Sequence, residues 1–107
     1  NLMNFEKYYN IDKNILLEDA TNIFKLSQDG HNIIILAETV LDEIDTKKSG
    51  FEEINFQARE FARILENAII VESIKKDLFK IIRLKIENDK NTIIDIIIHF
   101  HTAITTL

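Results

Sequence analysis

Three acidic side chains, Asp42, Glu43 and Asp45, fall within four positions directly after an apolar run, and Asp12 follows another segment of similar character. Carboxylate oxygens are the ligands that Mg²⁺ and Mn²⁺ prefer in proteins. In nucleases, such ions activate a water molecule and stabilise the leaving oxygen of a phosphodiester. This chemistry requires carboxylates from distant parts of the chain to converge, so the elements that carry these acids must bring them together.

The segments that precede the acids have the character of β-strands. Residues 5–12 carry aromatic and β-branched side chains, and residues 32–37 are almost entirely apolar, which is typical of a strand buried in a parallel sheet. Residues 15–26 have helical spacing and predict a short helix or turn. This order indicates an α/β fold with a mainly parallel sheet. Sites in such folds lie beyond the carboxyl ends of the strands, where Asp12 and the acids of 42–45 are expected to lie.

The second half of the chain has a less uniform pattern. Residues 51–65 form the clearest amphipathic helix, and residues 68–74 fit a short strand. Residues 75–87 fit a helix or a strand equally well. From Asn91 onward the isoleucine-rich run predicts a helix buried on most sides, with Asp89 or Asn91 as its cap. If all the isoleucine-rich runs were buried helices, the fold would instead be a helical bundle.

Composition limits the class of protein. A chain of 107 residues fits one domain, which we expect to span residues 3–107. Its net charge of −5 argues against a protein that coats nucleic acid or anionic membrane without specificity. The absence of cysteine excludes disulfides and thiolate metal sites. We expect no membrane span, because no apolar run reaches roughly 18 residues, and the reducing cytoplasm is the expected location.

Three motifs resemble those of PIN domains. D-K-N-I-L-L at 12–17 resembles their opening motif, and V-L-D-E-I-D-T-K-K at 40–48 resembles their second acidic motif. G-F-E-E-I-N-F-Q-A-R-E at 50–60 is similar to the N-x-x-A-R-E helix in the PIN half of PhoH-like proteins. The resemblance implies a three-layer α/β/α domain with a central, mostly parallel sheet. It also implies a metal-dependent nuclease, most often a ribonuclease, that uses Mg²⁺ or Mn²⁺.

The resemblance also assigns roles to residues. Asp12 and Glu43 match the first two catalytic, metal-binding acids, and Asn14 matches a support residue that orients Asp12. Asp42 and Asp45 flank the matched position. If they lie on the extended end of a strand, their side chains point away from that of Glu43. The resemblance therefore predicts that Glu43 alone of this cluster is a ligand.

Two residues are candidates for the third acid. Asp89 lies one position before the family register at the expected helix start, and Asp95 lies inside the apolar run, where a carboxylate needs a partner. The family's fourth acidic motif does not occur before Leu107, so the domain is expected to be incomplete at its C-terminus. Lys13 stands where the family usually has threonine or another small residue. It either pairs with the acids and weakens metal binding or points away from them.

The densest basic stretch suggests how a substrate would be held. Lys75, Lys76, Lys80 and Arg83 stand close together in an otherwise acidic chain. They predict phosphate contacts that position single-stranded RNA, and a solvated helix face would give the same pattern. The resemblance is compatible with a homodimer or larger oligomer and with an ATPase module on the same full-length protein. The alternative function is a non-catalytic, degenerate or truncated PIN-like module that serves such a protein.

Overall fold

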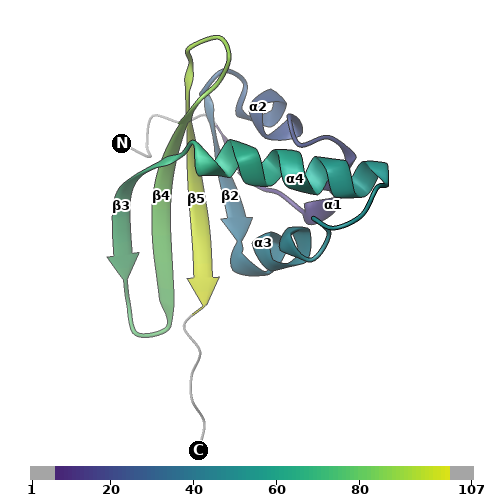
Figure 1. Ribbon diagram of the computed structural model, residues 1–107. Coiled ribbons are helices and arrows are strands. Elements are labelled where there is room, and N and C mark those ends of the chain that lie inside the picture. Colours follow the sequence, from purple (N-terminus) through teal and green to yellow (C-terminus); the bar gives the residue numbers. More distant parts are fainter. Residues whose placement is uncertain (1–6, 102–107) are drawn as a thin grey trace, which may run out of the picture.

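A computed structural model describes residues 7–101 as alternating helices and strands (Figure 1). In chain order the elements are β1 (Lys7–Asn10), α1 (Lys13–Glu18), α2 (Asn22–Ser27), β2 (Asn32–Ala37), α3 (Glu38–Asp45), α4 (Glu53–Glu66), β3 (Ile69–Lys75), β4 (Phe79–Glu87) and β5 (Ile93–His101). The ends of the predicted domain, residues 3–6 and 102–107, lie outside the described residues. No helix within 7–101 is long and apolar enough to cross a membrane.

The five strands form one sheet in the order β1-β2-β5-β4-β3. Strands β1, β2 and β5 run parallel to one another, whereas β4 and β3 continue the sheet by antiparallel pairing. The carboxyl ends of β1, β2 and β5 therefore lie together along one edge of the sheet, the edge that runs across the strands. The α/β class predicted from the sequence is confirmed, and the sheet combines a parallel half with an antiparallel half.

The helices share one core with a single face of the sheet. Alternate residues of β2, β5 and β4, such as Ile34, Ile96 and Leu84, are buried together with Leu16, Ile23, Val40, Ile44 and Phe61 from the helices. Helix α4 packs mainly on α1 and also contacts α3, and it crosses in front of the sheet in Figure 1. Within residues 7–101 the helices cover this face, and the second helical layer expected from the resemblance is not among the described residues.

The helix predicted from Asn91 onward is wrong, because this segment is strand β5. Asn91 has a φ of 62° in the turn after β4, and the chain then pairs with β4 from Ile93 to His101. The isoleucines suit a strand at least as well as a helix because their branched side chains pack well on a pleated surface. The segment 75–87, which fitted either structure, contains the β3–β4 turn and strand β4.

Asp95 finds its partners on the neighbouring strand. It lies on the face of β5 opposite the core and accepts hydrogen bonds from Nε and Nη2 of Arg83 at 3.2 and 3.0 Å. Lys85 Nζ lies 3.9 Å from the same oxygen. The partner that a buried carboxylate was expected to need is therefore supplied by β4. Asp95 stabilises the pairing of two strands.

Helix α4 holds the loop that leads out of α3. Its start carries a capping box: the Glu52 side chain accepts the Asn55 backbone N–H, and the Asn55 side chain accepts the Glu52 backbone N–H. Asn55 Nδ2 also donates to the Lys47 carbonyl at 2.8 Å. Arg59 donates to the carbonyls of Lys48 and Gly50 at 2.7 and 2.9 Å. The N-x-x-A-R-E motif therefore fixes the end of α3 relative to α4.

The turn between α1 and α2 depends on Asp19. Its carboxylate accepts hydrogen bonds from the Thr21 hydroxyl at 2.6 Å, the Thr21 backbone N–H at 2.9 Å and Lys25 Nζ at 3.1 Å. The Thr21 hydrogen bonds, followed by Lys25, lower the pKa of Asp19 below its usual range. The segment predicted as a short helix or turn thus contains two short helices, and Asp19 holds the turn between them.

The Arg83–Asp95 pair makes a testable contribution to stability. In Asp95→Asn the Arg83 side chain, which is only 18% exposed, loses its carboxylate, so the free energy of unfolding should fall by about 2 kcal/mol. Urea denaturation measures this loss. The control is Asp45→Asn, because the Asp45 carboxylate, paired with Lys48, is 70% exposed and should contribute less than about 1 kcal/mol. A loss no larger than that of the control would contradict the assigned role.

The Asp19 turn predicts a pH dependence. Because the pKa of Asp19 is lowered in the folded protein, its stabilising contribution is present above the usual aspartate pKa and is lost as the pH falls through the lowered value. NMR titration should give a pKa below that of a free aspartate. Thr21→Val should raise this pKa more than Lys25→Met, because the Thr21 hydroxyl is the strongest partner. The opposite ranking would contradict the assignment.

Candidate active site

Asp12 lies where β1 ends and α1 begins. The Ile11 N–H donates to the Ile35 carbonyl at 3.1 Å, which extends the pairing of β1 with β2 up to the acid. Asp12 itself has extended backbone angles as the N-cap of α1, and its exposed side chain accepts a hydrogen bond from Asn14 Nδ2 at 3.2 Å. This bond restricts the orientation of the carboxylate. It is the contact that the resemblance implied for Asn14.

Glu43 lies on helix α3, which starts directly after β2 with Ala37 as its N-cap. The extended end predicted for the acidic cluster is therefore wrong. Successive residues of a helix are rotated by about 100°, so the neighbouring acids point in different directions. Glu43 pairs with Lys13 on α1, whereas Asp45 pairs with Lys48 at 2.7 Å. Asp42 is exposed and, with Asp45, lines a small pocket between α3 and α4. Helix geometry separates these side chains where strand alternation was expected to do so.

Lys13 connects the two candidate acids. Its ammonium donates a hydrogen bond to Glu43 Oε2. This bond and the charge of Glu43 raise the pKa of Lys13, burial opposes the rise, and the charge of Asp12 adds to it. Of the two alternatives left by the sequence, pairing with the acids is the one observed. The lysine stays charged up to a pH above its usual pKa, so the ion pair persists at neutral pH.

The two candidates for a third acid lie elsewhere. Asp89 is in the β4–β5 turn, at the amino end of β5 and hence at the opposite edge of the sheet from Asp12. Asp89 does not begin a helix as expected, because a hairpin turn lies there. Asn88 closes this turn, and its Oδ1 accepts the N–H groups of Lys90 and Thr92 at 2.9 Å. Asp95 is engaged by Arg83. Residues 7–101 contain no group of three or more His, Asp or Glu side chains placed to hold a metal ion.

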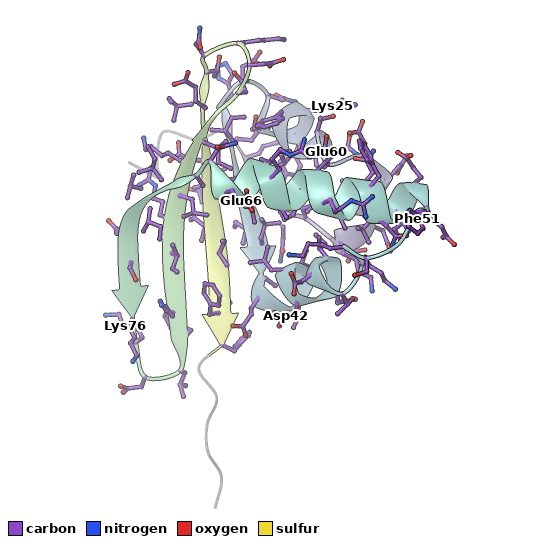
Figure 2. All side chains as sticks on the ribbon, viewed as in Figure 1. Lys25, Asp42, Phe51, Glu60, Glu66 and Lys76 are labelled. Atoms are coloured by element: carbon purple, nitrogen blue, oxygen red, sulfur yellow. The ribbon has the colours of Figure 1, made fainter. Side chains whose placement is uncertain are left out.

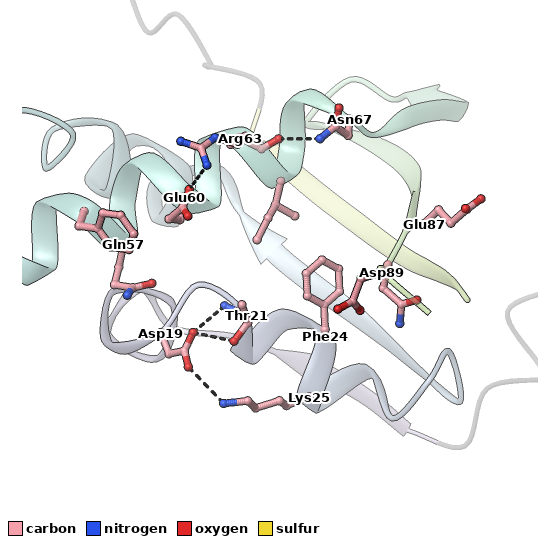
Figure 3. A pocket seen from close by; sticks show the side chains of 13 residues that line it. Asp19, Thr21, Phe24, Lys25, Gln57, Glu60, Arg63, Asn67, Glu87 and Asp89 are labelled. Atoms are coloured by element: carbon pink, nitrogen blue, oxygen red, sulfur yellow. Dashed lines mark hydrogen bonds and ion pairs between the residues drawn. The ribbon is translucent and has the colours of Figure 1, made fainter. Parts of the chain in front are cut away.

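Asp89 instead lines a pocket of about 610 Å³ between α2, α4 and the β4–β5 turn (Figure 3). Phe24 contributes to its apolar surface. Its charged side chains include two ion pairs, Asp19 with Lys25 at 3.1 Å and Glu60 with Arg63 at 2.7 Å. The pocket is separate from the Asp12 and Glu43 side chains, and the sequence patterns did not indicate it because its walls come from three distant segments.

The basic stretch lies at the same edge of the sheet as the acids. Phe79 at the start of β4 pairs with His101 at the end of β5, so the closed end of the β3–β4 hairpin lies near the carboxyl ends of the parallel strands. It carries Lys75 at the end of β3, Lys76 in the turn and Lys80 near the start of β4. Figure 2 shows Lys76 toward the same end of the molecule as α3. Arg83 differs from these lysines because its guanidinium is held by Asp95 on the sheet face.

The sequence left the Lys13–Glu43 pair open between two alternatives, because the pair joins residues on α1 and α3 and no local spacing could decide between them. The hydrogen bonds of Arg59 to the carbonyls of the loop after α3 were not predicted. The signal that could have found the first contact was the lysine in place of threonine in the D-K-N motif.

Comparison with known proteins agrees with the motifs. The family model described as "PIN domain" matches residues 9–104. Protein PhoH2 from Bacillus subtilis (strain 168) is 32% identical over 60 residues, which are 56% of this chain and 13% of that protein. The chain thus spans a small part of the length of this relative. No solved structure matches the chain. The extent of the family match, together with the α/β fold, shows that the chain belongs to the PIN domain family, which is a family of nucleases.

Proposed function

We propose that the protein is a metal-dependent ribonuclease that hydrolyses phosphodiester bonds of single-stranded RNA, with Asp12 and Glu43 as its catalytic acids. The observation that carries the proposal is the ion pair of Glu43 on α3 with Lys13, the residue that directly follows Asp12 at the end of β1. The hydrogen bond from Asn14 to Asp12 supports it, because a ligand must be held in a fixed orientation.

The donor set fits a hard divalent cation. Asp12 and Glu43 offer carboxylate oxygens that solvent can reach, Glu43 with a side chain that is 46% exposed. Mg²⁺ is usually held by one or two carboxylates, and water and substrate phosphates complete its shell. When bound, Mg²⁺ or Mn²⁺ would activate the attacking water and stabilise the leaving oxygen. The role of the chain is to hold and orient the two carboxylates.

The lysines at the closed end of the β3–β4 hairpin support a nucleic-acid substrate. Lys75, Lys76 and Lys80 lie at the edge of the sheet where the acids lie, so phosphates held by these lysines would lead a strand toward Asp12 and Glu43. Lys80 Nζ is also 5.8 Å from the Phe100 ring centroid, which restrains that side chain. Arg83 is a weaker candidate for RNA contact, because moving it would break its two hydrogen bonds to the buried Asp95 carboxylate and leave only Lys85 nearby.

A second candidate function is a non-catalytic PIN-like module of a larger, ATPase-containing protein. It is favoured by the pairing of Lys13 with Glu43 and by the small share of PhoH2 that the chain matches. A homodimer also stays a prediction. Sedimentation of the purified protein tests the oligomeric state. Cleavage assays separate the two functions.

The catalytic assignment predicts a contrast between neighbouring acids. Asp12→Asn and Glu43→Gln should each lower Mn²⁺-dependent cleavage of labelled single-stranded RNA by roughly a hundredfold or more, because each removes a charged metal ligand. Asp42→Asn and Asp45→Asn are the matched controls and should stay within a few-fold of the wild type. Gel-resolved cleavage rates measure the contrast, and chelation by EDTA should stop the reaction.

Two other outcomes would contradict this assignment. Loss of activity confined to the Asp42 or Asp45 variants would shift the site along α3. Cleavage that is absent at every Mn²⁺ concentration, in a protein whose circular dichroism is that of an α/β fold, would favour the non-catalytic module.

A further inference from the structure

The Lys13 side chain has an unusual place in the candidate site. It follows Asp12 directly in the chain and begins α1, and its ammonium reaches across to Glu43 on α3. The lysine side chain is 32% exposed and the glutamate 46%, so the contact lies at the rim of the molecule. Glu43 is therefore paired with a positive charge that belongs to the chain itself and that is carried by the residue next to Asp12.

We propose that Lys13 is a tethered counter-ion, which neutralises Glu43 in the metal-free protein and which a divalent cation must displace in order to bind Glu43. The proposal rests on the proposed function, since it takes Asp12 and Glu43 as the ligands. Lys13 acts through Glu43 and is a positioning residue. It would set how much free Mg²⁺ or Mn²⁺ the protein needs.

The geometry of a lysine makes such an exchange feasible. An ammonium is a compact charge on a flexible stem, so it can leave Glu43 for water without a change in the backbone of α1. An ion pair this exposed is worth little in water, so a doubly charged ion can replace it. Two carboxylates close together repel each other, and either cation relieves that repulsion. The lysine therefore weakens metal binding without abolishing it.

The chain contains a matched pair that lacks this role. Lys48 also pairs with an acid of α3, with its Nζ 2.7 Å from Asp45 Oδ1, and its pKa is likewise raised by that carboxylate. It lies at the end of α3 and contacts neither Asp12 nor Glu43 through any of the described ion pairs. Removal of Lys48 changes the net charge as much as removal of Lys13. It therefore controls for the general effect of charge on cation binding.

The test is the Mn²⁺ affinity of the metal-free protein, measured by isothermal titration calorimetry without RNA. Lys13→Met should lower the dissociation constant by roughly tenfold, because it removes a positive charge next to the bound cation. Lys13→Arg keeps the charge and should stay close to the wild type. Lys48→Met should change the dissociation constant less than about twofold, because its charge lies farther from the site.

Thermal unfolding supplies a second readout that is independent of activity. Lys13→Met should melt at a lower temperature than Lys48→Met in EDTA, because the repulsion between Asp12 and Glu43 is then unopposed, and Mn²⁺ should raise its melting temperature more than that of the wild type. The double variant Lys13→Met, Glu43→Gln should recover stability in EDTA and lose the gain in Mn²⁺ affinity. This recovery also distinguishes lost charge compensation from a folding defect.

Each outcome decides the matter. Equal dissociation constants for the wild type and Lys13→Met would overturn the counter-ion while leaving the metal site intact. An equal gain in Lys13→Met and Lys48→Met would overturn it as well, since net charge would explain both. Failure of Mn²⁺ to bind either the wild type or Lys13→Met would overturn both the counter-ion and the proposed metal-dependent function.

Discussion

The parallel pairing of β2 with β1 on one side and β5 on the other is the constraint on which the rest of the structure depends. Ile33, Ile34 and Leu36 of β2 are completely buried, so this strand can occupy only the centre of the parallel half. Because β1 and β2 run in the same direction, the residues that follow them emerge at the same edge. The position of Asp12 and of helix α3 is thus a consequence of strand direction.

The motif residues fall into two groups with different physical tasks. Asp12, Asn14 and Glu43 present polar groups at the edge of the sheet. Asn55 and Arg59 instead bind backbone carbonyls of the loop after α3, which fixes that helix without contact with the acids. A family motif can therefore be retained for geometry as well as for chemistry. In this chain the helix with the clearest amphipathic pattern is a support for the one that carries the acid.

The sequence predicted what depends on local pattern. The strands before the two acidic segments and the helix after Phe51 follow from runs and spacing within a few residues, and all three are confirmed. Strand β5 was mistaken for a helix because an isoleucine-rich run is compatible with either structure. What decides between them is the pairing with β4 and the bond from Arg83 to Asp95, and both lie outside the segment.

The acidic site shows the same limit. Glu43 could be selected by its register in the motif, yet the reason given for its distinct direction assumed a strand end and not the helix observed. Whether Lys13 contacts the acids depends on how α1 packs against α3, which no spacing in the sequence records. Contacts between elements had to come from the three-dimensional structure.

The central pairing also has a consequence for the order of folding. Ile34 lies beside Ile96, so β2 and β5 join across about sixty intervening residues, whereas β3, β4 and β5 are linked by short turns. The antiparallel half can form early from local contacts, but the parallel half must await the closure of a long loop, which makes folding slow for a chain of this size. We therefore expect β3, β4 and β5 to pair with one another before β2 joins β5, so that the β1–β2 segment, whose ends lead to Asp12 and to α3, is attached to the rest of the sheet late in folding.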